Sequence, residues 1–213
     1  MPPTRHKVKR ILEILKEHYP LVRTQLDYKT PFQLLISTIL SAQCTDRQVN
    51  SVTPKLFDRF PGPRELARAD LGELETIIHP TGFFHSKAKR IRECAKTILE
   101  RHDGEVPADL DKLVELPGVG RKTANVVLGA VWDIPGIVVD THVKRISNRL
   151  GLTGHTDPER IERDLMEILP KKAWNDFSLQ LIYHGRALCR ARKPRCESCP
   201  LQEYCDYHRE NRQ

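Results

Sequence analysis

The chain lacks the long apolar runs and leader features that would direct it to a membrane or out of the cell. No stretch of its 213 residues reaches the about 18 apolar residues that suggest a membrane-spanning helix. Residues 1–10 are charged and no apolar leader core follows them, so we expect no secretory signal. Because its cysteines are clustered and no export signal is present, we expect the protein in the reducing cytosol.

Strand signals are nearly absent as well. No segment alternates apolar and polar residues with a period of two, and the one short β-branched run is Ile137–Val139. The chain also has no low-complexity linker and no clear internal repeat. Apolar residues instead recur at helical spacing along nearly the whole chain. We therefore predict an all-α fold.

Capping signals bound several of these helices. Thr30-Pro31 is expected to open a buried helix, and Thr45 and Asp70 each precede a glutamine or glutamate three residues later. Ser86 is expected to open a long helix that Gly104 ends. Later helices are predicted over residues 121–132, from 141 to about 150, over 158–168, and from 174 to about 188.

The charge is unevenly placed. The formal net charge is +7, which favours a polyanionic partner such as nucleic acid. Four cations lie in one short loop near the C-terminus: Arg190, Arg192, Lys193 and Arg195. Further basic residues are Arg121, Lys122, Lys144, Arg145 and Arg149. A solvated helix face explains isolated cations, but it explains a loop of four cations poorly.

Four cysteines lie within the last 25 residues, with the spacing C-x6-C-x2-C-x5-C. They are Cys189, Cys196, Cys199 and Cys205. Four thiolates on one short segment are typical ligands of an iron–sulfur cluster or of zinc. Zinc sites more often use two short knuckles, so the wider arms here favour a cluster. Zinc binding or a disulfide remains the alternative from spacing alone. The separate Cys44 and Cys94 are expected to be small core residues.

The string LPGVGRKTA, residues 116–124, is the sharpest local signal. Gly118 and Gly120 flank Val119, which we expect to form an apolar tip, and a helix starts at Arg121. Glycine permits positive φ and close approach of a ligand, and the amides at a helix N-terminus bind phosphate. This contact would recognise the DNA backbone and not the base sequence. We interpret the string as a helix–hairpin–helix DNA-binding element; the alternative is an ordinary turn between helices.

Further motifs flank the hairpin. SAQCTD occupies residues 41–46, GFFHSK residues 82–87 and VVDTHVKR residues 138–145, and the cysteine tail follows. This ordered set resembles the endonuclease III family, bifunctional DNA glycosylases of base-excision repair, over essentially the full chain. Cys44 is a departure, because the family more often has another small residue there.

The resemblance implies two helical domains with a DNA-binding cleft between them. Residues 24–134 would form a six-helix domain with the helix–hairpin–helix element. Residues 1–23 and 135–213 would form a domain around a [4Fe–4S] cluster held by the four clustered cysteines. The expected partner is double-stranded DNA with damaged bases or abasic sites, bound by a monomer at the nucleoid, with no membrane involved.

The resemblance assigns catalysis to Lys122 and Asp140. Lys122 would be the nucleophile that forms a Schiff base with the sugar. An unperturbed lysine has a pKa of about 10.4, and lowering it to about 8 leaves roughly one molecule in ten as a free amine at pH 7. We expect the helix dipole, burial and Arg121 to lower it. Asp140 precedes a helix and is expected to cap it while also orienting the nucleophile and stabilising positive charge on the sugar.

Extrusion of a damaged base leaves a gap that the enzyme must fill. Gln43 is expected to fill it, and Phe83 matches the wedge position, where the family commonly has leucine. Lys193 and Arg195 are expected to meet DNA phosphates. A helix-end amide and a core aromatic are the simpler readings of Gln43 and Phe83.

Three alternative functions are compared with the sequence. The adenine-specific mismatch glycosylase needs a glutamate in the helix before the plug residue, and residues 32–40 contain none. A thymine-mismatch relative has tyrosine in place of the nucleophile, which Lys122 contradicts. A non-enzymatic, structure-specific DNA-binding protein is the third alternative.

Overall fold

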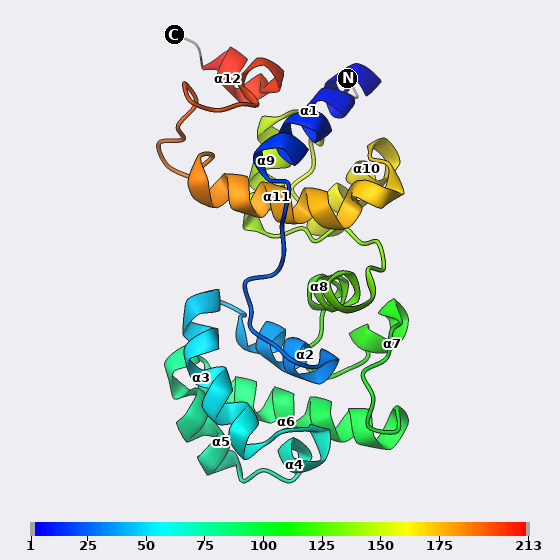
Figure 1. Cartoon of the computed structure of the whole chain (residues 1–213), viewed down its shortest axis with the longest axis vertical. Helices are drawn as coiled ribbons and strands as arrows, with labels where there is room; N and C mark the ends of the chain where they lie inside the picture. Colours follow the sequence, from blue (N-terminus) through cyan, green and yellow to red (C-terminus); the bar gives the residue numbers. More distant parts are fainter. Residues whose placement is uncertain (1–2, 212–213) are drawn as a thin grey trace. The chain divides into compact units, whose positions relative to one another are not determined.

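In the computed structural model, residues 3–211 are described, and this part of the chain is helical with no β-strand. The all-α prediction is confirmed (Figure 1). The α-helices are α1 Arg5–His18, α2 Pro31–Leu40, α3 Asp46–Arg59, α4 Pro63–Ala67, α5 Leu71–Ile78, α6 Phe84–Arg101, α7 Leu110–Val114, α8 Arg121–Trp132, α9 Thr141–Arg149, α10 Pro158–Ile168, α11 Trp174–Ala187 and α12 Asp206–Glu210. Short 3-10 turns are η1 His79–Thr81, η2 Lys171–Ala173 and η3 Gln202–Tyr204.

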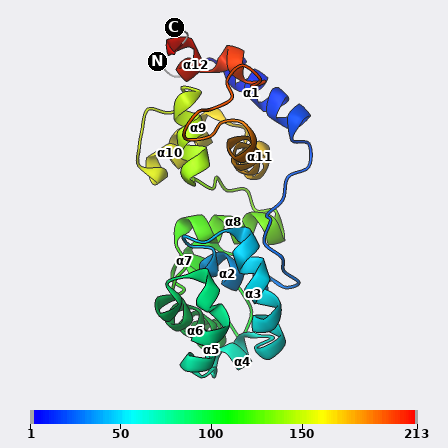
Figure 2. The same ribbon diagram turned by 90° about the vertical axis from the view of Figure 1, so that its left-hand side faces the viewer.

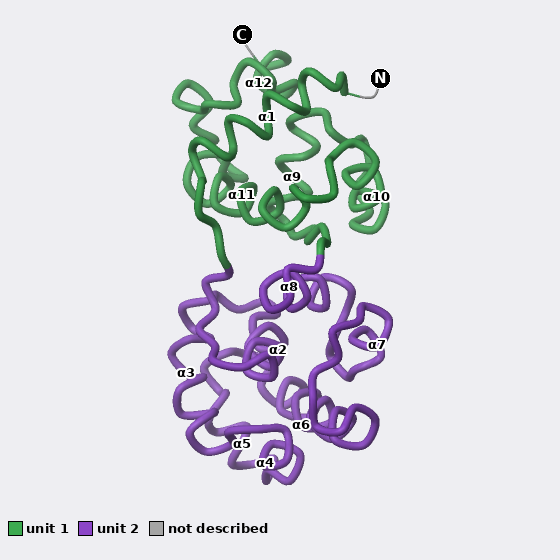
Figure 3. Tube along the Cα trace, turned by 45° about the vertical axis from the view of Figure 1, so that its right-hand side comes forward, with its two compact units in different colours: residues 1–23, 135–213 green, residues 24–134 purple. Residues whose placement is uncertain are grey.

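The chain divides into two compact units (Figure 3). Unit 1 combines Met1–Arg23 with Pro135–Gln213, so it contains both ends of the chain. Unit 2 is the continuous segment Thr24–Ile134. No helix within residues 3–211 is long and apolar enough to cross a membrane.

Unit 2 is built around α2. Eight of the ten residues of this helix are buried, among them Leu34, Leu35 and Ile36. A helix that is apolar on all sides needs neighbours on all sides, and α3, α6 and α8 pack against it. The unit contains seven α-helices, α2 to α8, where six were expected; α4 and α7 have only five residues each.

Unit 1 is built around α11, which packs against α1 and α9 (Figure 2). Its core contains Ile11, Leu15, Ile146, Phe177 and Leu181, all at most 1 % exposed. This core is separate from that of unit 2. Cysteines of the C-terminal segment pack at its edge.

Local sequence sets the helix starts. The side chains of Thr30, Thr45 and Asp70 each accept a hydrogen bond from the backbone N–H three residues further on, as predicted. Gly104, with φ +85°, ends α6 and donates its N–H to the Ile98 carbonyl at 3.1 Å.

The predicted start of α6 is wrong by two residues. The helix begins at Phe84 and not at Ser86. Phe83 occupies the N-cap position in a left-handed conformation, with φ +50°, and makes no side-chain cap. The prediction failed because it looked for a serine cap, whereas a strained backbone at Gly82–Phe83 sets this helix start.

Candidate functional site

The hairpin between α7 and α8 is fixed from inside unit 2. Leu116 and Val119 are buried in the core, and the Val119 N–H donates to the Leu116 carbonyl at 3.0 Å. Gly118 has φ +83°, and a Cβ placed there would lie 3.2 Å from Arg90 Cβ. Both the conformation and the tight packing therefore require glycine at this position.

The expected apolar tip is wrong. The Val119 side chain is only 6 % exposed and packs inward. The exposed positions of the hairpin are Gly118 and Gly120, so the outer face of this turn presents backbone and not a side chain. Val119 anchors the turn while its neighbours leave the backbone open to a ligand.

The N-terminus of α8 follows the hairpin directly. Gly120 is its N-cap residue, no side chain caps this end, and a Cβ at Gly120 would meet nothing within 4 Å. First-turn amides without a side-chain cap, at the positive end of a helix dipole, are suited to an anion. Arg121 and Lys122, both exposed, add two cations to the same turn. The burial expected for Lys122 is therefore absent.

Asp140 lies in unit 1, whereas Lys122 lies in unit 2. The β-branched segment before Asp140 runs extended along α11 and pairs with no strand. Asn175 Oδ1 accepts from the Gly136 N–H at 2.9 Å, and Ser178 Oγ accepts from the Val138 N–H at 3.0 Å. Two side chains of α11 thus accept hydrogen bonds from backbone N–H groups of this segment, which leads directly to Asp140 at the start of α9.

The capping role predicted for Asp140 is confirmed. Its Oδ1 accepts from the backbone N–H groups of His142 and Val143, both at 2.8 Å. Two hydrogen bonds to one carboxylate oxygen fix the orientation of the whole group. The position of the second carboxylate oxygen is therefore fixed as well.

Gln43 and Phe83 share an unusual backbone. Both are left-handed, with φ of +54° and +50°, and both are exposed, Phe83 by 66 %. This conformation is uncommon for residues with a side chain and is typical of functional turns. Phe83 is therefore not a core aromatic; that role falls to Phe84, which packs against the core of unit 2.

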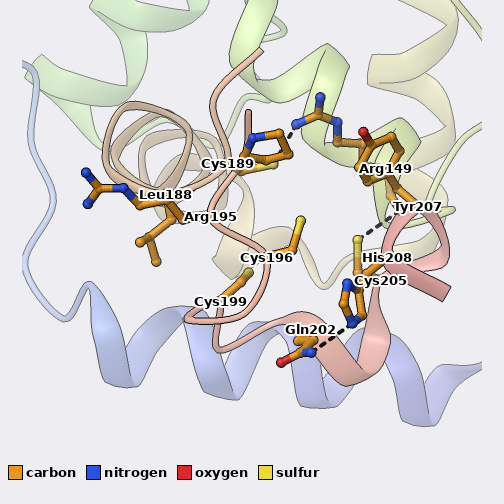
Figure 4. A pocket seen from close by; sticks show the side chains of 11 residues that line it. Arg149, Leu188, Cys189, Arg195, Cys196, Cys199, Gln202, Cys205, Tyr207 and His208 are labelled. Carbon is orange, nitrogen blue, oxygen red and sulfur yellow. Dashed lines mark hydrogen bonds between the residues drawn. The ribbon is translucent and has the colours of Figure 1, made fainter. Parts of the chain in front are cut away.

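The four clustered cysteines line one cavity in unit 1 (Figure 4). The cavity measures about 310 Å³, including space open to solvent. All four thiols are free, so the disulfide alternative is absent from this structure. Within residues 3–211 no three metal-binding side chains converge closely enough to hold a single metal ion. Because the thiols are spread around a cavity, they are better placed to bind the separated iron atoms of a cluster than to bind one zinc ion together.

Burial raises the pKa of these thiols. The pKa of Cys199 rises to about 11, chiefly through burial and further through the three neighbouring cysteines. Burial, followed by neighbouring cysteines, also raises the pKa of Cys196 and of Cys205. Metal ligands must be thiolates, and thiolates this crowded need adjacent positive charge, which iron supplies. The donor set therefore fits an iron–sulfur cluster.

Three side chains contact the cysteine segment in a way that the sequence did not predict, although it indicated Arg145 and Arg149 as cations. Arg149 donates to Cys189 Sγ at 3.2 Å and to the Arg190 carbonyl at 2.8 Å. Arg145 donates to the Cys189 carbonyl at 2.8 Å. Buried His184 lies with Nε2 3.5 Å from Cys199 Sγ. The i,i+4 spacing of the two arginines on α9 was the available signal, since it places both on one face.

The loop before Cys196 carries Lys193 and Arg195, both exposed. Lys193 is left-handed, with φ +50°, and the Arg195 N–H donates to the Leu188 carbonyl at 3.1 Å. The loop is thus closed back onto the end of α11, and its two cations are exposed to solvent.

Comparisons with known proteins agree with this arrangement. Residues 36–171 match the HhH-GPD superfamily base excision DNA repair protein, and residues 189–205 match the iron–sulfur binding domain of endonuclease III. The second match contains all four cysteines and confirms the iron–sulfur cofactor.

Relatives match over nearly the whole chain. Endonuclease III of Synechocystis sp. is 55 % identical over 96 % of this chain and 94 % of its own. Endonuclease III of Escherichia coli K12 is 42 % identical over 95 % of this chain and 97 % of its own.

A solved structure of a trapped endonuclease III–DNA covalent intermediate, an estranged-adenine complex, superposes with a TM-score of 0.94. It is 39 % identical and covers 99 % of this chain and 100 % of its own. A non-covalent endonuclease III–DNA complex, 40 % identical, gives a TM-score of 0.93 with 98 % of both chains covered. The chain belongs to the endonuclease III family, within the HhH-GPD superfamily of base excision DNA repair proteins.

Proposed function

We propose that this protein removes oxidised pyrimidines from double-stranded DNA and then nicks the strand on the 3′ side of the abasic site. It is thus a DNA N-glycosylase and an abasic-site lyase, acting as a monomer. Supporting this are the family, the full-length relatives and the likeness to an endonuclease III trapped in a covalent intermediate with DNA. The damaged base and the monomeric state are part of the proposal.

The nucleophile is Lys122. Its unprotonated amine attacks the sugar C1′ and forms a bond between C1′ and Nζ. The glycosidic bond between C1′ and the base nitrogen breaks, and its electrons leave with the base. Loss of a proton from the nitrogen and opening of the sugar ring give an imine. Removal of a 2′ proton then expels the 3′ phosphate by β-elimination, and water releases the enzyme. Since Lys122 is exposed in the free protein, its desolvation must come from bound DNA.

Asp140 assists this attack. Its Oδ1 is held by the N–H groups of His142 and Val143, so the other oxygen can face the reacting sugar. There it stabilises the positive charge that develops as the base leaves and orients or deprotonates the amine.

The remaining contacts hold and open the duplex. The backbone of Gly118–Gly120, with Arg121, binds a phosphate at the start of α8. Gln43 fills the space of the extruded base, and Phe83 stacks as a wedge on the neighbouring pair. Lys193 and Arg195 bind further phosphates.

The [4Fe–4S] cluster is held by Cys189, Cys196, Cys199 and Cys205. These four residues would supply one thiolate to each corner of the cluster, and a bound cluster would cross-link the C-terminal segment and leave no role for iron in binding substrate. The arginines from α9 fix the first cysteine and the start of the loop. The protein thereby presents its cationic loop in one conformation.

The observation that carries the proposal is the exposed lysine on the first turn of α8, directly after the glycine hairpin. Borohydride reduction tests it. Wild-type protein with duplex DNA containing thymine glycol or an abasic site should give a stable covalent adduct, and Lys122→Gln should give none while still binding DNA. Lys144→Gln is the matched control.

Absence of an adduct with wild-type protein would contradict the proposal. Base release without an adduct would indicate a monofunctional mismatch glycosylase. DNA binding without base release would indicate a non-enzymatic DNA-binding protein.

A further inference from the structure

Unit 2 contains a buried lysine that the proposed mechanism does not use. Lys87, in the first turn of α6, is only 3 % exposed. Its Nζ donates to the Thr81 carbonyl at 2.8 Å. Burial lowers the pKa of Lys87, an effect larger than the opposing influence of the Cys44 thiol. A buried ammonium near the positive end of a helix is costly, so it needs an explanation.

Lys87 holds the chain on both sides of the Gly82–Phe83 turn. Its ammonium binds the carbonyl of Thr81, before the turn, and its backbone N–H donates to the Phe83 carbonyl at 3.0 Å. The turn consists of two consecutive left-handed residues, with φ of +69° and +50°. An exposed aromatic side chain in this conformation persists only where its surroundings fix it.

A second exposed turn leads into α3. Cys44 directly follows left-handed Gln43 in this turn. The Cys44 N–H closes this turn onto the Ser41 carbonyl at 3.0 Å. The next helix, α3, packs against η1, which ends at Thr81. The ammonium that binds the last residue of η1 is thus connected, through η1 and α3, to the turn that presents Gln43, as well as directly to the turn that presents Phe83.

A purely structural role would not call for a lysine here. Apolar side chains of similar length fill a core at lower cost, because an ammonium must be removed from water. Lys96 on the same helix is exposed, as lysines usually are. Unlike an apolar side chain, the ammonium of Lys87 can donate a charged hydrogen bond to the Thr81 carbonyl beside the turn.

We propose that Lys87 is a positioning residue that holds the Gln43 and Phe83 turns in the conformation that enters the DNA stack. This inference rests on the proposed function. Lys87 touches neither the sugar nor the base; it acts through the two turns. Its loss should therefore impair steps that need insertion into a duplex and spare those that do not.

The test compares Lys87→Met with Lys96→Met as a matched control. On duplex DNA containing thymine glycol, Lys87→Met should lower the rate of base release by about tenfold or more. On a single-stranded abasic oligonucleotide, where no stacked base is displaced, the rate of borohydride trapping should stay at the wild-type value. 2-Aminopurine placed opposite the lesion should show reduced unstacking.

The ratio of the two rates within one preparation does not depend on how much of the protein is folded. An unchanged ratio for Lys87→Met would overturn the inference. A double-mutant cycle gives a second check: in a Gln43→Ala/Phe83→Ala background, Lys87→Met should have little further effect on the duplex rate. Full additivity would contradict action through the turns. Failure of wild-type protein to form any adduct would instead reject the proposed function.

Discussion

At the scale of single residues, one aspartate has a structural role as a helix cap and, in our proposal, a chemical role as well. The cap formed by Asp140 uses one carboxylate oxygen for two backbone N–H groups. Capping needs an acceptor oxygen, which asparagine also has, whereas charge stabilisation needs the negative carboxylate. The two roles can therefore be separated by a single substitution.

Asp140→Asn should keep the fold and lose the chemistry. The cost in the free energy of unfolding should stay below about 1 kcal/mol, because asparagine caps as well as aspartate does. The rate of base release should fall by about 100-fold or more, with DNA affinity retained. Thermal unfolding, quantitative binding and single-turnover kinetics measure the three quantities. Near wild-type turnover would discard the catalytic role.

What the sequence predicted at this scale depended on whether the signal was local. The caps at Thr30, Thr45 and Asp140 were predictable because each bond spans two or three residues. The contact of Arg149 with Cys189 spans 40 residues. The spacing of Arg145 and Arg149 indicated a shared helix face, but it could not indicate which residue that face contacts. Burial of Val119 was missed because a hairpin sequence does not show which neighbours cover it.

At the scale of elements, the connection after α9 leaves no room for a side chain. Gly151 has φ +65°, and a Cβ built on it would lie 1.8 Å from Asp206 Oδ2. Asp206 begins α12 and binds Lys7 of α1 at 2.7 Å. One glycine thus allows three elements of unit 1 to meet beside the cysteine segment.

Gly151→Ala should destabilise the protein by more than about 1 kcal/mol, since it adds both backbone strain and a collision. Gly154→Ala, three residues on, is the control, because a Cβ there meets nothing within 4 Å. Chemical denaturation of both variants measures the difference. Equal stability of the two variants would show that α12 moves aside at little cost.

The loop between α9 and α10 should give a pH-dependent contribution. Burial alone would raise the pKa of Asp164, but hydrogen bonds from Thr153 and His155 lower it overall. A depressed folded pKa means that the carboxylate stabilises the fold at neutral pH, and that this stability is lost as pH falls through that pKa.

Asp164→Asn should therefore cost stability at pH 7, by less than about 1 kcal/mol because the carboxylate is partly exposed. The difference from wild type should shrink as pH falls below the ordinary aspartate value. Denaturant titrations across this range test it, with exposed Glu167→Gln as control. A difference that grows on acidification would contradict the sign of the shift.

At the scale of the whole molecule, the protein has two cores, and all four clustered cysteines belong to the unit that joins both chain ends. The two-domain expectation came from the family resemblance and from the need for helices to cover the compact cysteine segment, because the sequence contains no linker that would mark a boundary. The helical class followed from periodicity, yet the packing of α1 with α11 pairs segments over 150 residues apart in sequence.

Removing iron should loosen unit 1 selectively. In the proposed site the four cysteines bind the cluster and so cross-link the segment from Cys189 to Cys205. Without iron, the raised pKa of Cys199 keeps its thiol protonated. Amide hydrogen exchange should rise in this segment and in α12, while α2 and α6 keep their protection. Simultaneous loss of protection in both units would show that their folding is not independent.

In the proposed mechanism, the amine of Lys122 bonds to the sugar of the damaged nucleotide. Mass spectrometry of the borohydride-reduced adduct, after digestion of protein and DNA, locates that bond directly. We expect the sugar remnant on Lys122 in wild-type protein and no adduct in Lys122→Gln. A remnant on Lys87, Lys144 or the N-terminal amine, or an undiminished adduct in Lys122→Gln, would contradict it.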